Sequence, residues 1–121
     1  MKSGAGPWTV RIAAAAEADF RQILQSTSRR FGRSQAPIYA EAPSAAIAAL
    51  TSGPSGPGVR HRGEIAKGVL TLHVARKGRK GRHFNVFRIR REAGIEAIDV
   101  LRILHEAMDF PRHLTPDRER D

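Results

Sequence analysis

Histidine and arginine side chains that could perform acid–base chemistry are concentrated in the last third of the chain. Cleavage of RNA through its 2′-hydroxyl group needs a base, cations that hold the phosphate and an acid for the leaving oxygen. The candidates of suitable type lie in or beside two predicted strands: Arg82, His83, Arg88, Arg102 and His105. His105 ends the last apolar run of the sequence, in the stretch VLRILHEAMDFPRHL. These residue types are compatible with a ribonuclease, but they do not identify which of them would be catalytic.

Other common chemistries find no support in the residue types. The chain has no cysteine, which excludes thiolate zinc sites and cysteine nucleophiles. Its five histidines are scattered and do not have the spacing of a metal-binding motif such as HExxH. The stretch GRKGR lacks the Ser or Thr that completes a phosphate-binding P-loop. We therefore expect no metal site and no cofactor.

The positive charge of the chain is confined to one segment. From Arg60 to Arg91 eleven Lys or Arg accompany one acid, Glu64, which gives +10, whereas the rest has ten bases and eleven acids. Such a field attracts nucleic acid, a ribosomal surface or an acidic protein, although a basic face that is merely solvated is the alternative. The densest part is a predicted hairpin tip, for which we predict a contact role. It consists of Arg76, Lys77, Arg79, Lys80 and Arg82.

The hydrophobic pattern predicts the order strand, helix, helix, strand, strand, strand. We expect a first strand at 8–13, helices at 16–31 and 34–50, and a meander of strands at 70–74, 84–89 and 98–104. A Gly/Pro/Ser loop at 51–58 separates the helical part from the meander. The result is an α+β fold in which a helical hairpin covers one face of a small, mostly antiparallel sheet. The last strand is apolar on both faces, which is typical of a central strand.

Several residues predict where the helices begin and end. Gly32 is expected to stop the first helix, and Ser34 is expected to cap the second. Pro43 is expected to kink or break the second helix, because an interior proline removes a hydrogen bond and clashes one turn back.

Charged residues inside the strands need partners. Arg88 and Arg102 would be costly to bury alone, so each is expected to find an acid or an open groove. Asp99 and Glu96 are possible partners.

At 121 residues the chain suits one domain. We expect a flexible N-terminus at 1–7, the domain at 8–114 and a disordered tail at 115–121. No segment approaches the ~20 apolar residues needed to span a bilayer, and no signal peptide is evident, so we expect a soluble, cytoplasmic protein without membrane contact. Because the residues after Leu104 leave the sheet, truncation at that point is expected to leave a folded domain.

Four stretches together resemble the ParE branch of the RelE/ParE toxins: AEADF, AAIAAL, LHVARKGRKGRHF and VLRILHEAMDFPRHL. The last is the most specific, because the final strand of that family runs into a tail of the form RILHxxMDxxxHL. The matching positions are Arg102, Ile103, Leu104, His105, Met108, Asp109, His113 and Leu114. The resemblance covers residues 8–114 and implies the toxin of a type II toxin–antitoxin pair, neutralised by a cognate antitoxin.

The resemblance leaves the toxin's target open between two classes. RelE-like members cleave mRNA on the ribosome, whereas ParE-like members inhibit DNA gyrase. Glu106 follows His105 where nuclease relatives carry an aromatic residue that could stack on a base, which favours the gyrase inhibitor. The alternatives are a ribosome-dependent mRNA endonuclease and an inert basic binding domain.

Three residues of the closing stretch are expected to contribute to toxicity together with the basic hairpin tip. They are His105, Met108 and Asp109. His105 could equally be structural, with a ring nitrogen that ties down the tail. Asp109 could accept backbone N–H groups or pair with Arg102 or Arg112, and so fix Met108 in the core.

Overall fold

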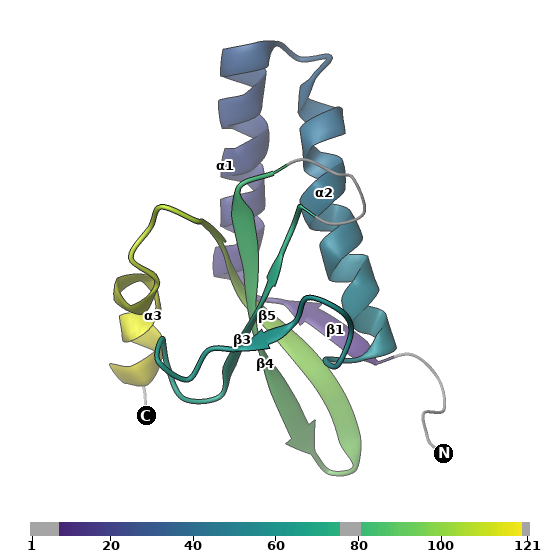
Figure 1. Ribbon diagram of the computed structural model, residues 1–121, viewed down its shortest axis with the longest axis vertical. Coiled ribbons are helices and arrows are strands. Elements are labelled where there is room, and N and C mark those ends of the chain that lie inside the picture. The colour runs from purple at the N-terminus through teal and green to yellow at the C-terminus, as the bar shows by residue number, and fades with distance from the viewer. Residues whose placement is uncertain (1–7, 76–80, 120–121) are drawn as a thin grey trace.

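A computed structural model describes residues 8–75 and 81–119 of the chain (Figure 1). Its strands form one sheet with the order β1-β5-β4-β3-β2. The strands are β1 Thr9–Ile12, β2 Arg60–His61, β3 Val69–His73, β4 His83–Glu92 and β5 Ile95–His105. β1 pairs with β5 in parallel, and the other neighbours are antiparallel. The predicted α+β fold is confirmed, and β5 occupies the interior position that its two apolar faces indicated.

The helices form a hairpin and a separate C-terminal element (Figure 1). They are α1 Ala14–Phe31, α2 Ala36–Ala49 followed by the 3-10 turn η1 Leu50–Ser52, and α3 Phe110–Glu119. α1 ends at Gly32 as predicted, with φ 93° and its N–H bonded to the carbonyl of Ser28. The prediction that Ser34 caps α2 is wrong. Ser34 lies inside a turn closed by the N–H of Gln35 on the carbonyl of Gly32, so Gln35 takes the N-cap position.

The break predicted at Pro43 does not occur, because α2 runs without interruption from Ala36 to Ala49. Pro43 is buried, and its helix neighbours Ala42 and Ala46 are at most 2% exposed in the first core cluster. Packing against α1 and the sheet therefore offsets the hydrogen bond that proline cannot make.

Both faces of the sheet are covered, each by its own cluster of apolar side chains. Ile98, Phe87 and Leu72 pack with residues of α1 and α2. On the opposite face Val86 and Leu104 pack against two buried side chains of α3. These are Phe110 and Leu114, at 7% and 5% exposed. The structure therefore adds a second layer of helix to the single helical layer that the sequence predicted.

The backbone of α3 continues through residues 115–119, which the sequence had placed in the C-terminal tail 115–121. The expected flexible N-terminus, 1–7, lies outside the described residues. Among the described residues, no helix combines the length and the apolar character that crossing a membrane requires.

A β-bulge in β5 decides which side chains reach which core. The register passes from Val86 opposite Arg102 to Phe87 opposite Val100, so Leu101 has no partner on β4. Because of this extra residue, the positions of β5 that face the core beneath α1 and α2 change from even numbers, Ile98 and Val100, to the odd-numbered Ile103, and Leu104 faces the core beneath α3. The same irregularity lies beside Arg102.

β4 and β5 are joined by a two-residue turn, Ala93 and Gly94, both with positive φ (51° and 80°). Two successive positive φ values are characteristic of the type I′ turn, whose twist matches a two-residue hairpin. The hairpin predicted at this point is confirmed, and its register fixes the residues of β4 and β5 against each other.

Candidate functional site

A groove with a volume of about 690 Å³ lies between the helical hairpin and the ends of β4 and β5. Its floor includes the apolar residues Ile23, Pro43 and Ile103. The charged or prominent side chains that line it include Asp19, Arg29, Arg30, Phe31, Arg82, His83, His105 and Met108. We refer to this feature as the groove.

The groove brings together four residues that the sequence had singled out: Arg82, His83, His105 and Met108. β4 begins at His83 and β5 ends at His105, and antiparallel pairing places these two residues directly opposite each other. Their rings meet edge to face, with centroids 5.2 Å apart. The position of each histidine at a strand end is therefore sufficient to place both in the same site.

The remaining candidates for catalysis lie elsewhere. Arg88 is five residues beyond His83 on β4, about 17 Å along the strand. The guanidinium of Arg102 is directed to Asp19 on α1. The structure thus separates the five residues that a nuclease would have used, and only three line the groove.

Most of the predicted basic tip, Arg76 to Lys80, lies outside the described residues. Its last member, Arg82, is largely exposed and pairs with Glu106 at 3.2 Å. Next to it, a Cβ on Gly81 would lie 2.4 Å from Cγ2 of Val74. Only glycine fits this close approach, so the base of the β3–β4 hairpin is held tightly.

Glu106 connects the ends of three strands. Its carboxylate accepts hydrogen bonds from Nε of Arg82 and lies 2.9 Å from Nε2 of His73, and its N–H bonds to the carbonyl of Arg82. The hydrogen bond with His73, followed by that with Arg82, lowers the pKa of Glu106. Sequence reasoning used Glu106 only as a departure from nuclease relatives and did not predict this contact.

His105 anchors the chain where it leaves the sheet. Nδ1 of its ring accepts the N–H of Ala107 at 3.0 Å, and its carbonyl accepts the N–H of Met108 at 2.9 Å. These two hydrogen bonds agree with the alternative in which His105 has a structural role and ties down the tail. The turn leaves Met108 45% exposed on the groove, which contradicts the alternative in which Asp109 fixes Met108 in the core.

Asp109 takes part in the start of α3 through its backbone. Its carbonyl accepts the N–H of Arg112 at 3.2 Å. Arg102, one of the two arginines that the sequence allowed as a partner of its carboxylate, is engaged by Asp19 instead.

The strongest polar contact of the site was not predicted. Asp19 accepts two hydrogen bonds from Arg102, at 2.8 and 2.9 Å, and a third from the backbone N–H of Ile103 at 2.9 Å. The side chains of Asp19 and Arg102 are 11% and 24% exposed. Arg102 also donates to the carbonyl of His113 on α3, so one arginine joins α1, β5 and α3.

Neither of the two acids suggested by the sequence, Asp99 and Glu96, is the partner of Arg102 in the structure. Asp99 pairs with Arg11 and Arg90 instead, and Glu96 pairs with Arg91. One sequence feature could have indicated the true partner, Asp19. It lies three residues after Ala16 and four before Ile23, within the apolar stripe of α1, where an unpaired acid would be costly.

His83 predicts a pH dependence of stability. Burial, followed by the nearby His105, lowers the pKa of His83 below its ordinary value of 6.5, against the opposing influence of Asp19 and Glu106. The unfolded chain therefore binds a proton more readily than the native one, and stability should fall as pH decreases through and below about 6.5. His83→Asn should reduce this loss, as measured by urea unfolding at pH 7.5 and 5.5. The exposed His61→Asn is the control, and an unchanged pH dependence in His83→Asn would contradict the assignment.

Comparison with known proteins agrees with this architecture. Residues 10–110 match the family described as the ParE toxin of the type II toxin–antitoxin system parDE. A solved structure of the chromosomal ParDE TA system from P. aeruginosa superposes with a TM-score of 0.66 at 20% identity, covering 84% of this chain and 98% of that one. The YoeB/ParE toxin from Agrobacterium tumefaciens superposes with a TM-score of 0.52 at 14% identity, covering 80% and 96%. No curated protein matches the sequence.

The family match spans most of the chain, whereas the structural matches at these identities show the shared fold. The chain belongs to the family of ParE toxins of type II toxin–antitoxin systems. Membership in this family implies a cognate antitoxin as partner. Within the described residues, no three His, Asp or Glu side chains are grouped so as to hold a metal ion.

Proposed function

We propose that this toxin inhibits DNA gyrase and that its antitoxin neutralises it by occupying the groove. The proposal rests on the family, together with one feature of the groove. Phe31 and Met108, which are 50% and 45% exposed, line the same hollow from opposite elements. Large apolar side chains left open in this way mark a binding surface for protein.

The chemistry of the groove indicates the kind of segment that fits. The lining is positively charged through Arg29 and Arg30 on α1 and through Arg82, which directly precedes β4. The floor is apolar. An amphipathic antitoxin segment with acidic residues along its polar side would satisfy both surfaces. Such a segment would cover His105 and Met108, the residues expected to contribute to toxicity.

The antitoxin proposal predicts a large effect of Phe31→Glu. A carboxylate placed against the apolar floor is expected to weaken antitoxin binding about 100-fold, because an unpaired charge would be desolvated. Isothermal titration with the purified antitoxin measures this affinity. Ile38→Glu is the matched control, because Ile38 is 60% exposed on α2 and does not line the groove. Equal losses in both variants would argue against the groove.

Several contacts support inhibition over RNA cleavage. Arg88 and Arg102 do not line the groove, and the guanidinium of Arg102 is bound by Asp19. Arg82 is paired with Glu106, and Nδ1 of His105 is engaged by the backbone. One observation favours the second candidate, a ribosome-dependent endonuclease: His83 and His105 face each other beside Arg82, where one could act as base and the other as acid.

A pair of assays separates these functions. We expect the purified protein to inhibit supercoiling by gyrase and to leave ribosome-bound transcripts intact. His105→Ala should weaken inhibition only as far as it loosens the turn at Ala107, by less than about 10-fold, whereas loss of a proton-transfer group typically costs about 10²- to 10⁴-fold. His61→Ala, on β2, is the control.

Transcript cleavage that His105→Ala abolishes, with gyrase unaffected, would replace the inhibitor with the nuclease. If the protein is active in neither assay, the alternative that remains is an inert basic binding domain.

A further inference from the structure

The face of the sheet turned away from α1 and α2 carries a row of arginines that the proposed function does not use. The pairing register defines the row. Arg62 bonds through its N–H to the carbonyl of Val69, Val69 lies opposite Arg88, and Arg88 lies opposite Asp99, which pairs in register with Arg11. Opposed residues in a sheet point to the same side, so this row crosses β3, β4, β5 and β1 and reaches Arg62, which directly follows β2.

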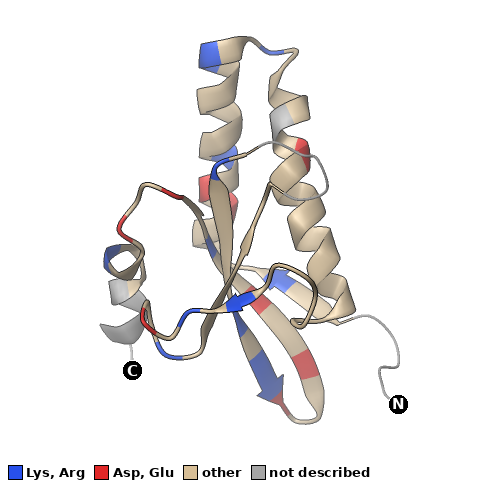
Figure 2. Cartoon of the chain, in the orientation of Figure 1, with Lys and Arg blue, Asp and Glu red and all other residues tan. Residues whose placement is uncertain are grey.

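Two more arginines lie one rung to either side of the row. Arg60 is opposite Thr71, and Arg90 is opposite Ala97. We call these five residues, together with Asp99, the outer face: Arg11, Arg60, Arg62, Arg88 and Arg90. Figure 2 shows the corresponding basic positions on β1, β2 and the lower part of β4.

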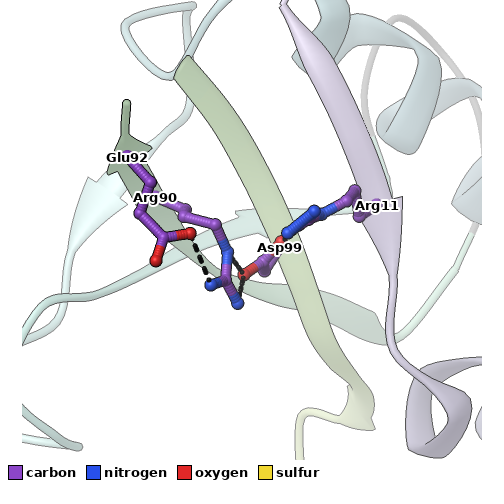
Figure 3. Close-up of polar contacts among 4 residues, drawn as sticks. All are labelled: Arg11, Arg90, Glu92 and Asp99. Atoms are coloured by element: carbon purple, nitrogen blue, oxygen red, sulfur yellow. Dashed lines mark hydrogen bonds and ion pairs between the residues drawn. The ribbon is translucent and has the colours of Figure 1, made fainter. Parts of the chain in front are cut away.

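Acidic side chains hold these guanidinium groups in place without cancelling their charge. Asp99 receives Arg11 at 3.4 Å and Arg90 at 2.5 Å, and Arg90 also contacts Glu92 at 3.3 Å (Figure 3). Arg62 pairs with Glu64. Three of the five arginines, Arg11, Arg62 and Arg90, are thus held by three acids. Exposed pairs of this kind are weak, so a stronger anion can compete for the free N–H donors.

The outer face lacks what a protein partner would use as an anchor. The apolar members of these rungs are Val69, Val86 and Ala97, and each is at most 2% exposed. Within these three rungs the open side chains are polar and charged, and the exposed Ile95 (61%) lies one rung further along the same face, beside the hairpin turn, whereas Phe31 and Met108 line the groove itself. A surface of this composition suits a polyanion better than a protein interface.

The spacing of the arginines is fixed by the sheet. Neighbouring strands lie about 4.8 Å apart, so the backbones of Arg11 and Arg88, two strands apart, are separated by about 10 Å, as are those of Arg88 and Arg62. A rigid array of guanidinium groups complements a rigid array of phosphates, which a duplex provides and a flexible single strand does not. We infer that the outer face binds the phosphate backbone of double-stranded DNA, independently of base sequence.

The test measures binding of the full-length toxin to a labelled duplex of about 20 base pairs, roughly two helical turns, by fluorescence anisotropy over a range of salt concentrations. Arg11→Gln with Arg88→Gln removes two charges from the outer face. Loss of two phosphate contacts should reduce the slope of log K against log salt by about 1.8 and weaken binding at least 10-fold at low salt. Arg29→Gln with Arg30→Gln removes the same charge from the groove and should leave both quantities nearly unchanged.

A third variant changes binding in the opposite direction. Asp99→Asn removes the acid at the centre of the row and should tighten duplex binding, so the inference remains testable even if the double variant folds poorly. Equal losses of duplex affinity in the two double variants would show that only net charge matters, and this would overturn the inference. Binding that is as tight to a single strand or to duplex RNA of equal length would overturn the choice of duplex DNA. Gyrase inhibition is measured separately and does not depend on this outcome.

Discussion

Asp19→Ala is expected to lower the free energy of unfolding by about 3 to 4 kcal/mol, a large share of the stability of a domain of this size. The carboxylate of Asp19 satisfies two N–H groups of Arg102 and the backbone N–H of Ile103 in a part-buried position. Its removal takes away the acceptor of two guanidinium N–H groups and of one backbone amide, and Arg102 keeps its bond to the carbonyl of His113. Truncating one partner of such a pair costs more than the pair contributes, because the other partner stays desolvated.

Urea unfolding followed by circular dichroism measures this loss. Glu96→Ala is the matched control, because Glu96 pairs with Arg91 at the surface, where both side chains are more than half exposed. It should cost less than about 1 kcal/mol. Asp19→Ala combined with Arg102→Ala should cost less than the sum of the single variants. A single variant Asp19→Ala as stable as the control would show that Arg102 regains its solvation.

Truncation after Leu104 is expected to abolish cooperative folding, which reverses the expectation from sequence. The cut removes Phe110 and Leu114, whose side chains pack with Val86 and Leu104. Deleting a buried Phe or Leu side chain costs about 3 to 5 kcal/mol, so the two together approach the whole stability of a small domain. The cut also removes the carbonyl of His113 that Arg102 uses.

Two point variants distinguish loss of the core from loss of chain length. Phe110→Ala should lower the free energy of unfolding by about 3 to 4 kcal/mol, whereas Met108→Ala, on the exposed turn, should change it by less than about 1 kcal/mol. Circular dichroism and urea unfolding report both. A truncated chain that unfolds with the wild-type midpoint would show that α3 is dispensable for the fold.

The order of the main elements could be predicted from sequence because it depends on local patterns. Alternation predicts β1, the apolar stripe predicts α1, and Gly32 ends that helix through its positive φ. The interior position of β5 follows from its apolar residues on both faces. Each of these features is determined by residues close together in the chain.

α3 was missed because its sequence has few apolar residues. Its start nonetheless carries local features that indicate a helix. Asp109 precedes the first turn, Pro111 lies within that turn, and Phe110 and Leu114 are four residues apart. This spacing buries two side chains on one face, which is sufficient to attach a short polar helix to the sheet.

The site was predicted where it depends on strand ends and missed where it depends on tertiary packing. His83 and His105 end adjacent strands, so their proximity follows from the hairpin. Phe31 belonged to the apolar stripe of α1 and Asp19 to its first turns, and nothing local indicates that one lines a groove while the other binds Arg102. Those contacts join residues far apart in sequence, and only the packing of α1 on β5 creates them.

The short outer strands also bear on how copies of the chain associate. β1 has four residues and β2 has two, and the parallel pairing of β1 with β5 ends at Val100. Beyond that point Asp19 occupies the N–H of Ile103, so this stretch of β5 does not offer its full set of donors to another strand. An unpaired strand edge is a template on which a strand of another chain can pair, which leads to aggregation. The carboxylate of Asp19, which joins α1 to the sheet, therefore also makes this edge of β5 less available for aggregation.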